Sequence, residues 1–398
     1  MNTNEKQDDA NTMSKTSKNI SSIHNPSQIK FPSSNIYKKL QTSRTPLSVN
    51  FEITARCNNN CRHCYINLPE DDSKAALSEL TIDEIEHIAD QAVQQGVLWG
   101  LITGGEPLLR PDFSEIYLLL KKKGLLVSVF TNACLIDESH INLFKKYKPR
   151  ELEVSVYGAT EKTYEKVTGI KGSYKRFKRG LNLLIHNNIP VSLKAIAMRS
   201  NVNEIEQIAN FCSKYSQEKF KFGPFLHMRY DRNTKRNRLI TEERLTAEEI
   251  VKLEHNKFFR REPLEKGCIN IKKNNDLGGA GQIFTCGILK NGFYISFDGK
   301  LRVCPSLWHP DYVRDLKKKT LMGAHREIAE NIMNAKSSNE DFLNKCNKCK
   351  IFNLCYFCPA NSYLETGKLD NPVDYFCANA QARQEATHSC RKEKECTF

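Results

Sequence analysis

The sequence predicts an α/β fold in which helices cover a parallel sheet. Between residues 47 and 226, six short apolar segments alternate with segments of helical period, and this alternation is typical of parallel sheets. Polar motifs follow the first, second and fourth apolar segments, where the carboxyl ends of parallel strands meet at one edge. Six such units can form an open, three-quarter barrel or a doubly wound sheet. Both arrangements place the functional loops at that edge.

The strands are predicted from apolar runs. In the first of them, Leu47, Val49, Phe51 and Ile53 alternate with polar residues, which is the pattern of a strand with one buried face. The six predicted strands comprise residues 47–53, 97–103, 125–131, 152–157, 191–198 and 220–226.

Helices are predicted between these strands from their apolar period and their end signals. Thr81 and Glu84 form a capping box that starts a helix ending at Gly96. Gly124 ends the following helix, because glycine adopts the left-handed backbone of a helix end. The remaining predicted helices comprise residues 111–123, 137–147, 174–187 and 202–215.

Composition excludes several classes of protein. The 398 residues are 39% hydrophobic, with a mean hydropathy of −0.54 and no long apolar run, so neither a membrane-spanning helix nor a membrane partner is expected. The first residues lack the apolar segment of a secretory signal, which predicts a cytoplasmic protein. In that compartment the 15 cysteines favour metal ligation over disulfides. The formal charge of +14 permits an acidic peptide or a nucleic acid as partner and selects neither.

Changes in composition divide the chain into five parts. The first part is rich in Ser, Asn, Lys and Thr and cannot bury enough apolar surface to order itself. The predicted parts are a disordered tail (1–45), the α/β core (46–240), a charged linker (241–267), a cysteine-rich domain (268–385) and a second tail (386–398).

Three cysteines follow the first predicted strand, in the order Cys57-Asn-Asn-Asn-Cys61-Arg-His-Cys64. Three thiolates on one short loop can hold three irons of a [4Fe–4S] cluster. The fourth iron then lacks a protein ligand and can bind another molecule. One alternative is a zinc site, which usually takes two ligands from such a loop and two from a distant one. The other is a cluster completed by a fourth cysteine from elsewhere.

This cysteine loop, together with a Gly-Gly-Glu-Pro motif at residues 104–107, resembles the radical S-adenosylmethionine (radical SAM) enzymes over residues 47 to about 230. The resemblance implies a partial (β/α)6 TIM-like barrel and a [4Fe–4S] cluster on the cysteine loop. It also implies that the open iron binds the amino and carboxylate groups of S-adenosylmethionine. Reductive cleavage of that cofactor yields a 5′-deoxyadenosyl radical, which abstracts a substrate hydrogen.

The same resemblance predicts four residues that bind the cofactor. Gly104 and Gly105 let the backbone approach a ligand closely. Glu106 can accept a hydrogen bond from a charged amino group, or it can be the N-cap of the next helix. Ser155 matches the family position that contacts the ribose, and its alternative role is a local turn bond. His63 stands where the family tends to have an aromatic residue near the adenine.

The C-terminal region contains a second set of cysteines. Asp298-Gly299 lies between two apolar segments and predicts a hairpin turn that brings Cys286 and Cys304 close together. Residues 346–358 form a compact knuckle with four cysteines.

Seven cysteines with this spacing resemble the SPASM extension of radical SAM enzymes, over about residues 268–385. The resemblance implies two auxiliary [4Fe–4S] clusters, and a double zinc ribbon is the alternative. The implied ligands are Cys346, Cys349, Cys355 and Cys377 for the distal cluster, and Cys286, Cys304 and Cys358 for the proximal cluster, with Cys268 or the substrate in its fourth position.

Four cysteines fall outside both patterns. Cys134 follows a strand end and Cys212 lies on an apolar helix face, so both are predicted to be packed thiols. Cys390 and Cys396 are assigned no role.

The resemblance also implies a substrate class. Relatives with this extension mostly modify peptides or proteins, by crosslinking or side-chain oxidation, so a peptide or protein substrate is predicted. A small-molecule or haem precursor is the alternative. An external electron donor of the flavodoxin or ferredoxin type is implied, and a separate peptide-recognition protein is compatible with the pattern. The catalytic base is not identified, because Pro305 follows Cys304 where sulfatase-maturing relatives have an aspartate.

Two other classes compete with the radical enzyme. An electron carrier would bind clusters without catalysis, and such a protein needs no Gly-Gly-Glu-Pro ligand pocket. A basic nucleic-acid binder with zinc knuckles would be colourless and would bind with a steep salt dependence. Nucleic acid is not the expected partner.

A run of cations follows the sixth strand. These side chains can bind an acidic leader peptide or substrate carboxylates, or they can form a solvated linker surface. The run comprises Arg229, Arg232, Lys235, Arg236 and Arg238.

Overall fold

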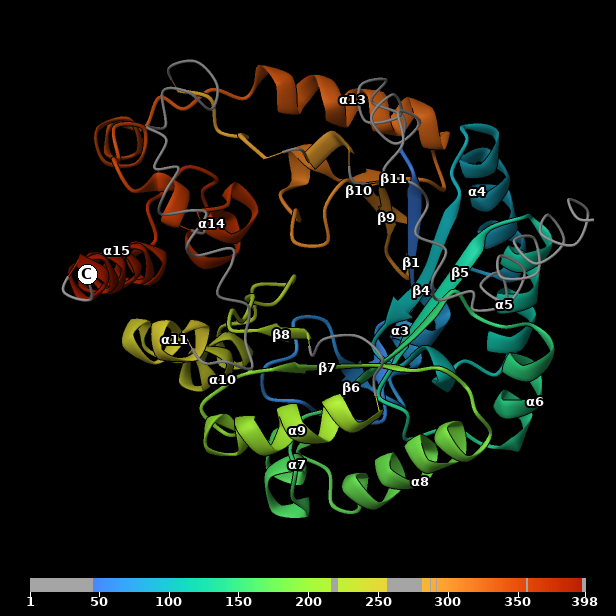
Figure 1. Cartoon of the computed structure of the whole chain (residues 1–398). Helices are drawn as coiled ribbons and strands as arrows, with labels where there is room; N and C mark the ends of the chain where they lie inside the picture. The colour runs from blue at the N-terminus through green and yellow to red at the C-terminus, as the bar shows by residue number, and fades with distance from the viewer. Residues whose placement is uncertain are drawn as a thin grey trace, which may run out of the picture. The chain divides into compact units, whose positions relative to one another are not determined.

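A nine-stranded sheet forms the centre of the computed structural model and curves into part of a barrel (Figure 1). Its strand order is β11-β10-β9-β1-β4-β5-β6-β7-β8. From β1 to β8 the strands of this sheet lie in chain order and every neighbouring pair is parallel. A doubly wound sheet reverses its strand order, so the barrel alternative is confirmed. These strands are Ser48–Thr54 (β1), Trp99–Gly104 (β4), Leu126–Thr131 (β5), Glu151–Ser155 (β6), Ser192–Ile196 (β7) and Lys221–Gly223 (β8).

The structure describes residues 46–215, 221–255, 281–286, 288–290, 292–355 and 357–395. All of them belong to one compact unit, Thr45–Phe398. The predicted tail 1–45, residues 256–267 of the predicted linker, Cys268 and Cys396 lie outside the described residues, as does the side chain of Cys390.

Helices cover the outside of the curved sheet, as the alternating pattern predicts (Figure 1). Thr81 caps the first of the predicted helices, and the capping box with Glu84 is confirmed. The sixth strand is shorter than predicted because only three of its residues pair with β7. The predicted helices are Ile82–Gln94 (α4), Phe113–Lys122 (α5), Glu138–Lys146 (α6), Ser173–His186 (α8) and Ile205–Tyr215 (α9).

Between residues 47 and 226, two short α-helices and one small ribbon were not predicted. The helices are Ser73–Ser78 (α3) and Glu161–Thr168 (α7), and the parallel ribbon joins Arg56–Cys57 (β2) to Leu68–Pro69 (β3). Each is too short to show a clear period in the sequence. The ribbon and α7 are nonetheless the elements that hold the cysteine loop.

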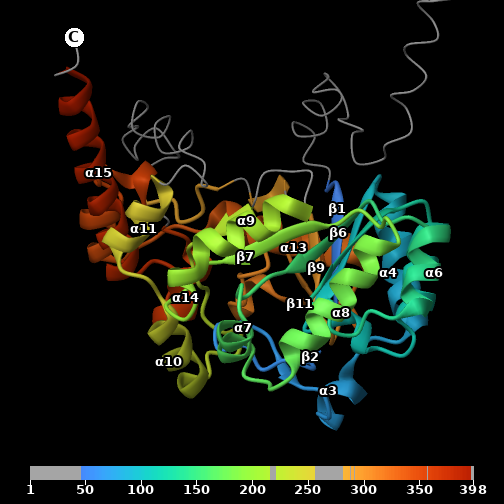
Figure 2. The ribbon, with the colours of Figure 1, turned by 60° about the horizontal axis from the view of Figure 1, so that its bottom comes forward.

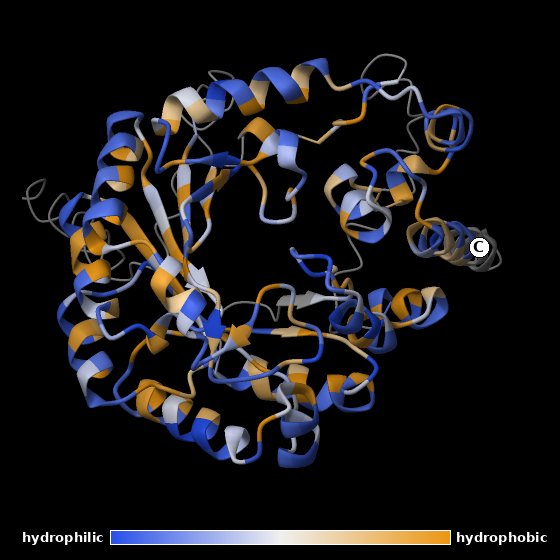
Figure 3. Ribbon diagram, turned by 180° about the vertical axis from the view of Figure 1, so that it is seen from behind, coloured by the Kyte–Doolittle hydropathy of each residue, from blue (hydrophilic) through white to orange (hydrophobic). Residues whose placement is uncertain are grey.

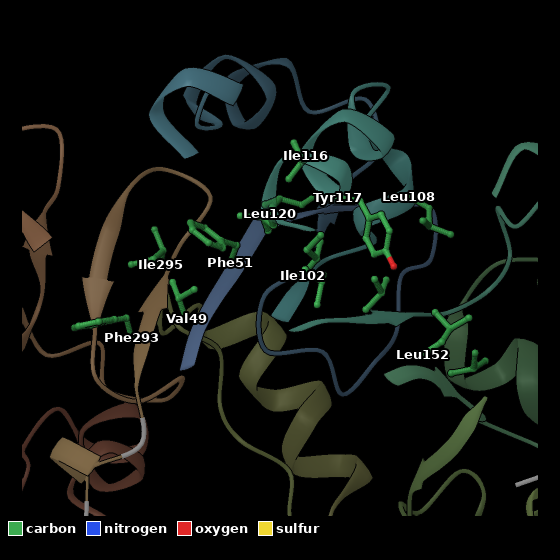
Figure 4. Close-up of a cluster of buried hydrophobic side chains, with 14 of the residues drawn as sticks. Val49, Phe51, Ile102, Leu108, Ile116, Tyr117, Leu120, Leu152, Phe293 and Ile295 are labelled. Atoms are coloured by element: carbon green, nitrogen blue, oxygen red, sulfur yellow. The ribbon is translucent and has the colours of Figure 1, made fainter. Parts of the chain in front are cut away.

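The two faces of the sheet differ in chemistry. On β1, Val49 and Phe51 pack in the apolar layer with Ile116 and Leu120 of α5 (Figure 4). Figure 3 shows the matching pattern on the covering helices, with hydrophilic residues toward the outside. The alternate strand residues point into the barrel, and several of them are polar: Asn50, Glu52, Ser128, Glu153, Lys194 and Arg302. The interior is therefore polar, unlike the apolar barrel cores that only maintain a fold.

The cysteine-rich region continues the same sheet. Strand β9 (Phe293–Ile295) pairs in parallel with β1, and β10 (Lys300–Arg302) pairs antiparallel with β9 through the predicted turn at Gly299. The predicted separation between an α/β core and a cysteine-rich domain is thus crossed by a continuous hydrogen-bonded sheet. Strand β11 (Arg314–Asp315) completes it. The sequence pattern did not predict this continuity, because the residues of a hairpin do not indicate which other strand the hairpin will pair with.

Helices also occupy the described part of the predicted linker and the start of the predicted second tail. Thr234–Glu243 (α10) crosses from the predicted core into the linker, Ala247–Glu254 (α11) lies within the linker, and Asp374–Glu395 (α15) runs beyond residue 385. Figure 2 shows α15 beside α11, and Arg383 of α15 is ion-paired with Glu254 of α11. The region also contains Leu321–Asn334 (α13) and Pro359–Thr366 (α14). Within the described residues, no helix combines the length and apolarity needed to cross a membrane.

One buried ion pair joins the hairpin to the barrel. Glu52 of β1 and Arg302 of β10 form an ion pair with side-chain exposures of 2% and 0%. The Arg302 guanidinium also lies 3.7 Å from the ring centre of Trp308. Burial raises the pKa of Glu52, although Arg302 opposes the shift. Removing one partner would leave the other charge buried and unpaired.

We therefore expect Arg302→Met to lower the free energy of unfolding by about 3 kcal/mol. Without the guanidinium the folded-state pKa of Glu52 rises further above its unfolded value. The deficit should then grow as pH rises from the unfolded-state pKa of Glu52 toward its folded-state pKa and level off above it, because in that window only the unfolded carboxyl has lost its proton. Urea unfolding of the variant at pH 5 and pH 8 measures this. The double variant Glu52→Gln/Arg302→Met should recover most of the loss, and an equal deficit in the single and double variants would contradict the account.

Candidate functional site: three groups of buried thiols

The cysteine loop lies between β2 and β3, at the carboxyl end of β1. Burial raises the pKa of Cys57 and Cys61, and the neighbouring thiols of the loop raise both further. Cys64 belongs to the same electrostatic group, since its charge acts on both of the others. The structure thus brings together the three cysteines that the motif predicts.

Backbone N–H groups already point at two of these thiols. The Asn59 amide donates to Cys57 Sγ at 3.4 Å and the Asn67 amide donates to Cys64 Sγ at 3.3 Å. N–H donors of this kind stabilise thiolate ligands. The crowded thiols, whose ionised forms repel one another, are the donor set that an iron–sulfur cluster with its cationic irons would neutralise. The residues present therefore fit the implied cluster.

The cysteine loop is held from one side by the end of α7. The Asn60 and Arg62 amides donate to the carbonyl oxygens of Thr168 (2.8 Å) and Val167 (3.1 Å). A Cβ on Gly169 would lie 3.1 Å from the Asn60 carbonyl oxygen, and Gly169 has a φ of +67°. The turn after α7 consequently needs a glycine to pack against the loop.

The segment after the sixth strand holds the loop from the other side. Arg236 donates to Asn60 Oδ1 (2.8 Å), Asn67 Oδ1 (2.8 Å) and the Cys61 carbonyl oxygen (3.2 Å). Arg229, which is 2% exposed, donates to both oxygens of Asn67. These two arginines are engaged within the chain, so the hypothesis that they form an open surface for an acidic partner is wrong for them.

A further ion pair anchors the loop to α10. Arg62 Nε lies 2.7 Å from Glu243 Oε1, and Glu243 also accepts from the backbone amide and hydroxyl of Ser200. Sequence reasoning missed Arg62, Asn67 and Glu243. The position of Arg62 between two motif cysteines was the available signal.

The Gly-Gly-Glu-Pro loop packs against the backbone at the end of β1. A Cβ on Gly104 would collide with the Thr54 carbonyl oxygen, and one on Gly105 would collide with the carbonyl oxygens of Ala55 and Arg56. Gly104 also has a φ of +133°. The close approach that the two glycines permit is therefore to the end of β1 and the start of the cysteine loop. The predicted approach to a ligand stays a prediction.

Glu106 caps the short 3-10 helix Pro107–Leu109 (η2), which is the alternative role that the sequence left open. Its carboxylate is fully buried and accepts from the Leu108 amide (3.2 Å), the Thr131 hydroxyl (2.7 Å) and the Asn132 amide (2.8 Å). Burial raises the pKa of Glu106 to about 7. The carboxylate thus joins the Gly-Gly-Glu-Pro loop to the end of β5, and its predicted contact with a cofactor amino group is not tested by these bonds.

Ser155 ends β6, near the cysteine loop. Burial raises the pKa of the Tyr157 hydroxyl, the charges of Cys61 and Cys64 raise it further, and Ser155 opposes the shift. The ring of His63 lies 5.2 Å from that of Tyr157, and burial lowers the pKa of His63 to about 4. His63 is therefore neutral at physiological pH, and its Nδ1 is buried with no hydrogen-bond partner in the part of the chain that the structure describes.

The C-terminal cysteines gather into two groups. Burial raises the pKa of Cys358 to about 12, and the nearby thiols Cys304 and Cys286 contribute. The hairpin β9–β10 places Cys304 beside Cys286, as the turn predicts. These are the three cysteines that the resemblance implies for the proximal cluster. Cys268, its possible fourth ligand, lies outside the described residues.

The second C-terminal group consists of four cysteines. Burial raises the pKa of Cys346 and of Cys355 to about 12, and the charges of Cys377 and Cys349 act on both. The knuckle supplies three of these thiols and the start of α15 supplies Cys377. All four match the distal set, and their mutual repulsion again suits a cationic metal centre.

Two cysteines are packed thiols, as predicted. Cys134 and Cys212 are both buried and burial raises the pKa of each. Every cysteine whose side chain the structure describes is a free thiol. Among those described residues, no three Cys, His, Asp or Glu side chains converge closely enough for a single metal ion.

Comparison with known proteins identifies the core. Residues 51–212 match the model of the Radical SAM superfamily. These residues form a radical SAM domain. The matched residues contain the cysteine loop, the Gly-Gly-Glu-Pro loop and the strands β4 to β7 that position them. The cysteine-rich C-terminal region is consistent with the SPASM extension predicted from its spacing.

Three curated relatives illustrate the similarity. The chain is 25% identical to the AdoMet-dependent heme synthase of Methanosarcina barkeri, over 82% of this chain and 94% of the relative. It is 30% identical to AlbA, the antilisterial bacteriocin subtilosin biosynthesis protein of Bacillus subtilis, over 45% of this chain and 39% of AlbA. It is also 30% identical to the PqqA peptide cyclase of Gluconobacter oxydans, over 41% of this chain and 45% of the cyclase. The last two matches span less than half of each relative.

Solved structures share the fold over most of the chain. Streptococcus suis SuiB bound to the precursor peptide SuiA aligns with a TM-score of 0.59 and 18% identity, over 90% of this chain and 85% of SuiB. Native anSMEcpe with bound AdoMet aligns with a TM-score of 0.57 and 19% identity, over 85% of this chain and 96% of anSMEcpe. At this identity the likeness shows the fold alone.

The clamp on the cysteine loop can be tested by removing one arginine. We expect Arg236→Gln to make reconstituted protein lose the iron of this loop about tenfold faster to a chelator, because residues that orient metal ligands typically control affinity to that extent. Arg238→Gln is the matched control, since the Arg238 side chain is 84% exposed and its ion pair within the described part of the chain is with Glu242. Equal iron loss in both variants would contradict the assigned role.

Proposed function

We propose that this radical SAM enzyme holds three [4Fe–4S] clusters and oxidatively modifies a side chain of a peptide or protein. The observation that carries the proposal is the gathering of ten cysteine thiols into three groups, one at the carboxyl end of β1 and two in the C-terminal region. Two of the groups contain three thiols and the third contains four.

The cysteine loop would carry the cluster at which the radical is formed. Cys57, Cys61 and Cys64 would hold a cluster whose fourth iron is open to S-adenosylmethionine. When bound, the cluster and cofactor supply reductive cleavage to a 5′-deoxyadenosyl radical. The chain's own contribution is to fix the loop through Arg62 and Arg236, and to enclose the site within the polar interior of the barrel.

The auxiliary clusters are assigned to the other two groups. Cys346, Cys349, Cys355 and Cys377 would complete the distal cluster. Cys286, Cys304 and Cys358 would hold the proximal one, leaving one position for Cys268 or the substrate. The auxiliary clusters would act as electron acceptors. A substrate that loses a hydrogen atom and then a second electron is oxidised by two electrons, and a nearby cluster can take up the second one.

A peptide or protein substrate is supported by two relatives. AlbA and the PqqA peptide cyclase share 30% identity with the core, against 25% for the heme synthase. The proposal includes an external one-electron donor of the flavodoxin or ferredoxin type and permits a separate peptide-recognition protein. A reducing compartment such as the cytoplasm suits the free thiols.

A haem precursor is the second candidate substrate. The match to the heme synthase spans nearly the whole of that relative, whereas the peptide-related matches do not. A gene for a short peptide beside this one, and a mass change in that peptide on incubation, would favour the first candidate. Turnover of a carboxylated tetrapyrrole would favour the second.

Cofactor cleavage tests the radical chemistry. Anaerobically reconstituted protein, reduced with dithionite and given S-adenosylmethionine, is expected to form 5′-deoxyadenosine. Cys64→Ala should abolish the product, because the loop then offers only two thiolates. Cys212→Ala, which alters a packed thiol on α9, should leave it unchanged. Product formation by Cys64→Ala at the wild-type rate would refute the assignment.

Iron content tests the auxiliary clusters. The reconstituted chain should bind about twelve irons, four in each of three clusters. Replacing Cys349 and Cys355 together by alanine should remove about four of them while the 5′-deoxyadenosine activity persists. About four irons in the unmodified chain, or zinc in place of iron, would contradict the assignment.

A further inference from the structure

The turn after β5 brings an asparagine amide to the cysteine loop. Asn132 follows the last residue of β5 and is 7% exposed. The next residue, Ala133, is fully buried and has a φ of +60°, a left-handed conformation that a residue with a Cβ adopts only at some cost in free energy. Strain of this kind persists where the surrounding structure demands it and is common at functional sites.

Neighbouring elements hold this strained turn in place. A Cβ on Gly180 of α8 would collide with the Ala133 carbonyl oxygen, so the helix carries a glycine where the turn presses against it. The Thr131 hydroxyl accepts from the Ala133 amide at 3.0 Å and donates to Glu106. Glu106 Oε2 accepts from the Asn132 amide. The Gly-Gly-Glu-Pro loop therefore fixes the backbone of Asn132.

Hydrogen bonds also determine which way the Asn132 side chain faces. The Cys134 amide donates to Asn132 Oδ1 at 2.9 Å, so the oxygen must face that backbone N–H. The NH2 group consequently points toward the cysteine loop. It donates to Asn58 Oδ1 at 2.9 Å and lies 3.8 Å from Cys57 Sγ.

The second amide of this pair has a donor that no described residue accepts. Asn58 Oδ1 is occupied by Asn132, and Asn58 Nδ2 is buried without a hydrogen-bond partner among the described residues. A buried N–H without a partner is destabilising unless a bound group accepts it. Two side-chain amides are thus held beside Cys57, with one N–H directed at its sulfur and another left for a bound acceptor.

We propose that Asn132 is a positioning residue that sets the reduction potential of the cluster on Cys57, Cys61 and Cys64. The inference rests on the proposed function, since it presumes that Cys57 is a cluster ligand. An N–H donor to a ligand sulfur stabilises the more negative, reduced cluster and so raises its potential. Glu106, on this account, acts at a distance by holding the backbone of Asn132.

Redox titration of the full reconstituted chain tests the proposal. The signal of the radical cluster is recognised among the three by its change on addition of S-adenosylmethionine. Asn132→Leu, which removes the donor, should shift its midpoint to a more negative potential. Asn132→Asp should shift it further, because a carboxylate also places negative charge beside the sulfur. Ala133→Gly is the matched control: it relieves the backbone strain, keeps the amide and should leave the midpoint unchanged.

A measurement on the unmodified chain covers the case in which the leucine and aspartate variants lose the cluster. Protein grown with asparagine that carries ¹⁵N only in its side-chain amide should show a ¹⁵N coupling in the pulsed electron paramagnetic resonance (EPR) spectrum of the reduced radical cluster. No such coupling, or an unchanged midpoint in an iron-replete Asn132→Leu variant, would overturn the inference. If no signal responds to S-adenosylmethionine at all, the proposed function fails instead.

Discussion

Three mutually repelling thiols have to be buried side by side at the carboxyl end of the first strand, and much of the surrounding structure serves to keep them there. The loop that carries them has little regular structure of its own, only the two-residue strands at its ends. It is fixed by the end of α7, by two arginines after the sixth strand and by an ion pair to α10. Elements more than 100 residues away in sequence therefore determine the geometry of an eight-residue motif.

The barrel supplies the second requirement, an enclosed but polar interior. Strand residues that face the helices are apolar, whereas those that face inward include two ion pairs, Glu153–Lys194 and Glu52–Arg302. The latter pair also joins the C-terminal hairpin to β1. Cys304, which follows β10, is thereby held by the same sheet that positions the cysteine loop.

The sequence predicted the elements better than their contacts. Six strands and the capping box at Thr81 follow from apolar period and end signals, and the hairpin at Gly299 follows from its turn residues. The order of the strands in the sheet was left open by the pattern. Membership of the auxiliary groups was implied by cysteine spacing. What spacing does not contain is which distant side chain reaches a motif. Arg229 and Arg236 belong to a run of cations that was predicted either to bind an acidic partner or to form a solvated linker surface, since a run of cations looks the same whether it faces solvent or a cysteine loop. Glu106 shows the same limit: its motif predicts a loop near a cofactor, but its bonds to Thr131 and Asn132 depend on how the strands pack.

The most direct test of the central claim is Mössbauer spectroscopy of ⁵⁷Fe-reconstituted protein in which the auxiliary cysteines have been replaced, with and without S-adenosylmethionine. One iron of the remaining cluster should differ from the other three, and its isomer shift should change when the compound binds. Four irons that stay equivalent and do not respond would show that the cluster has no open iron, and would contradict the account.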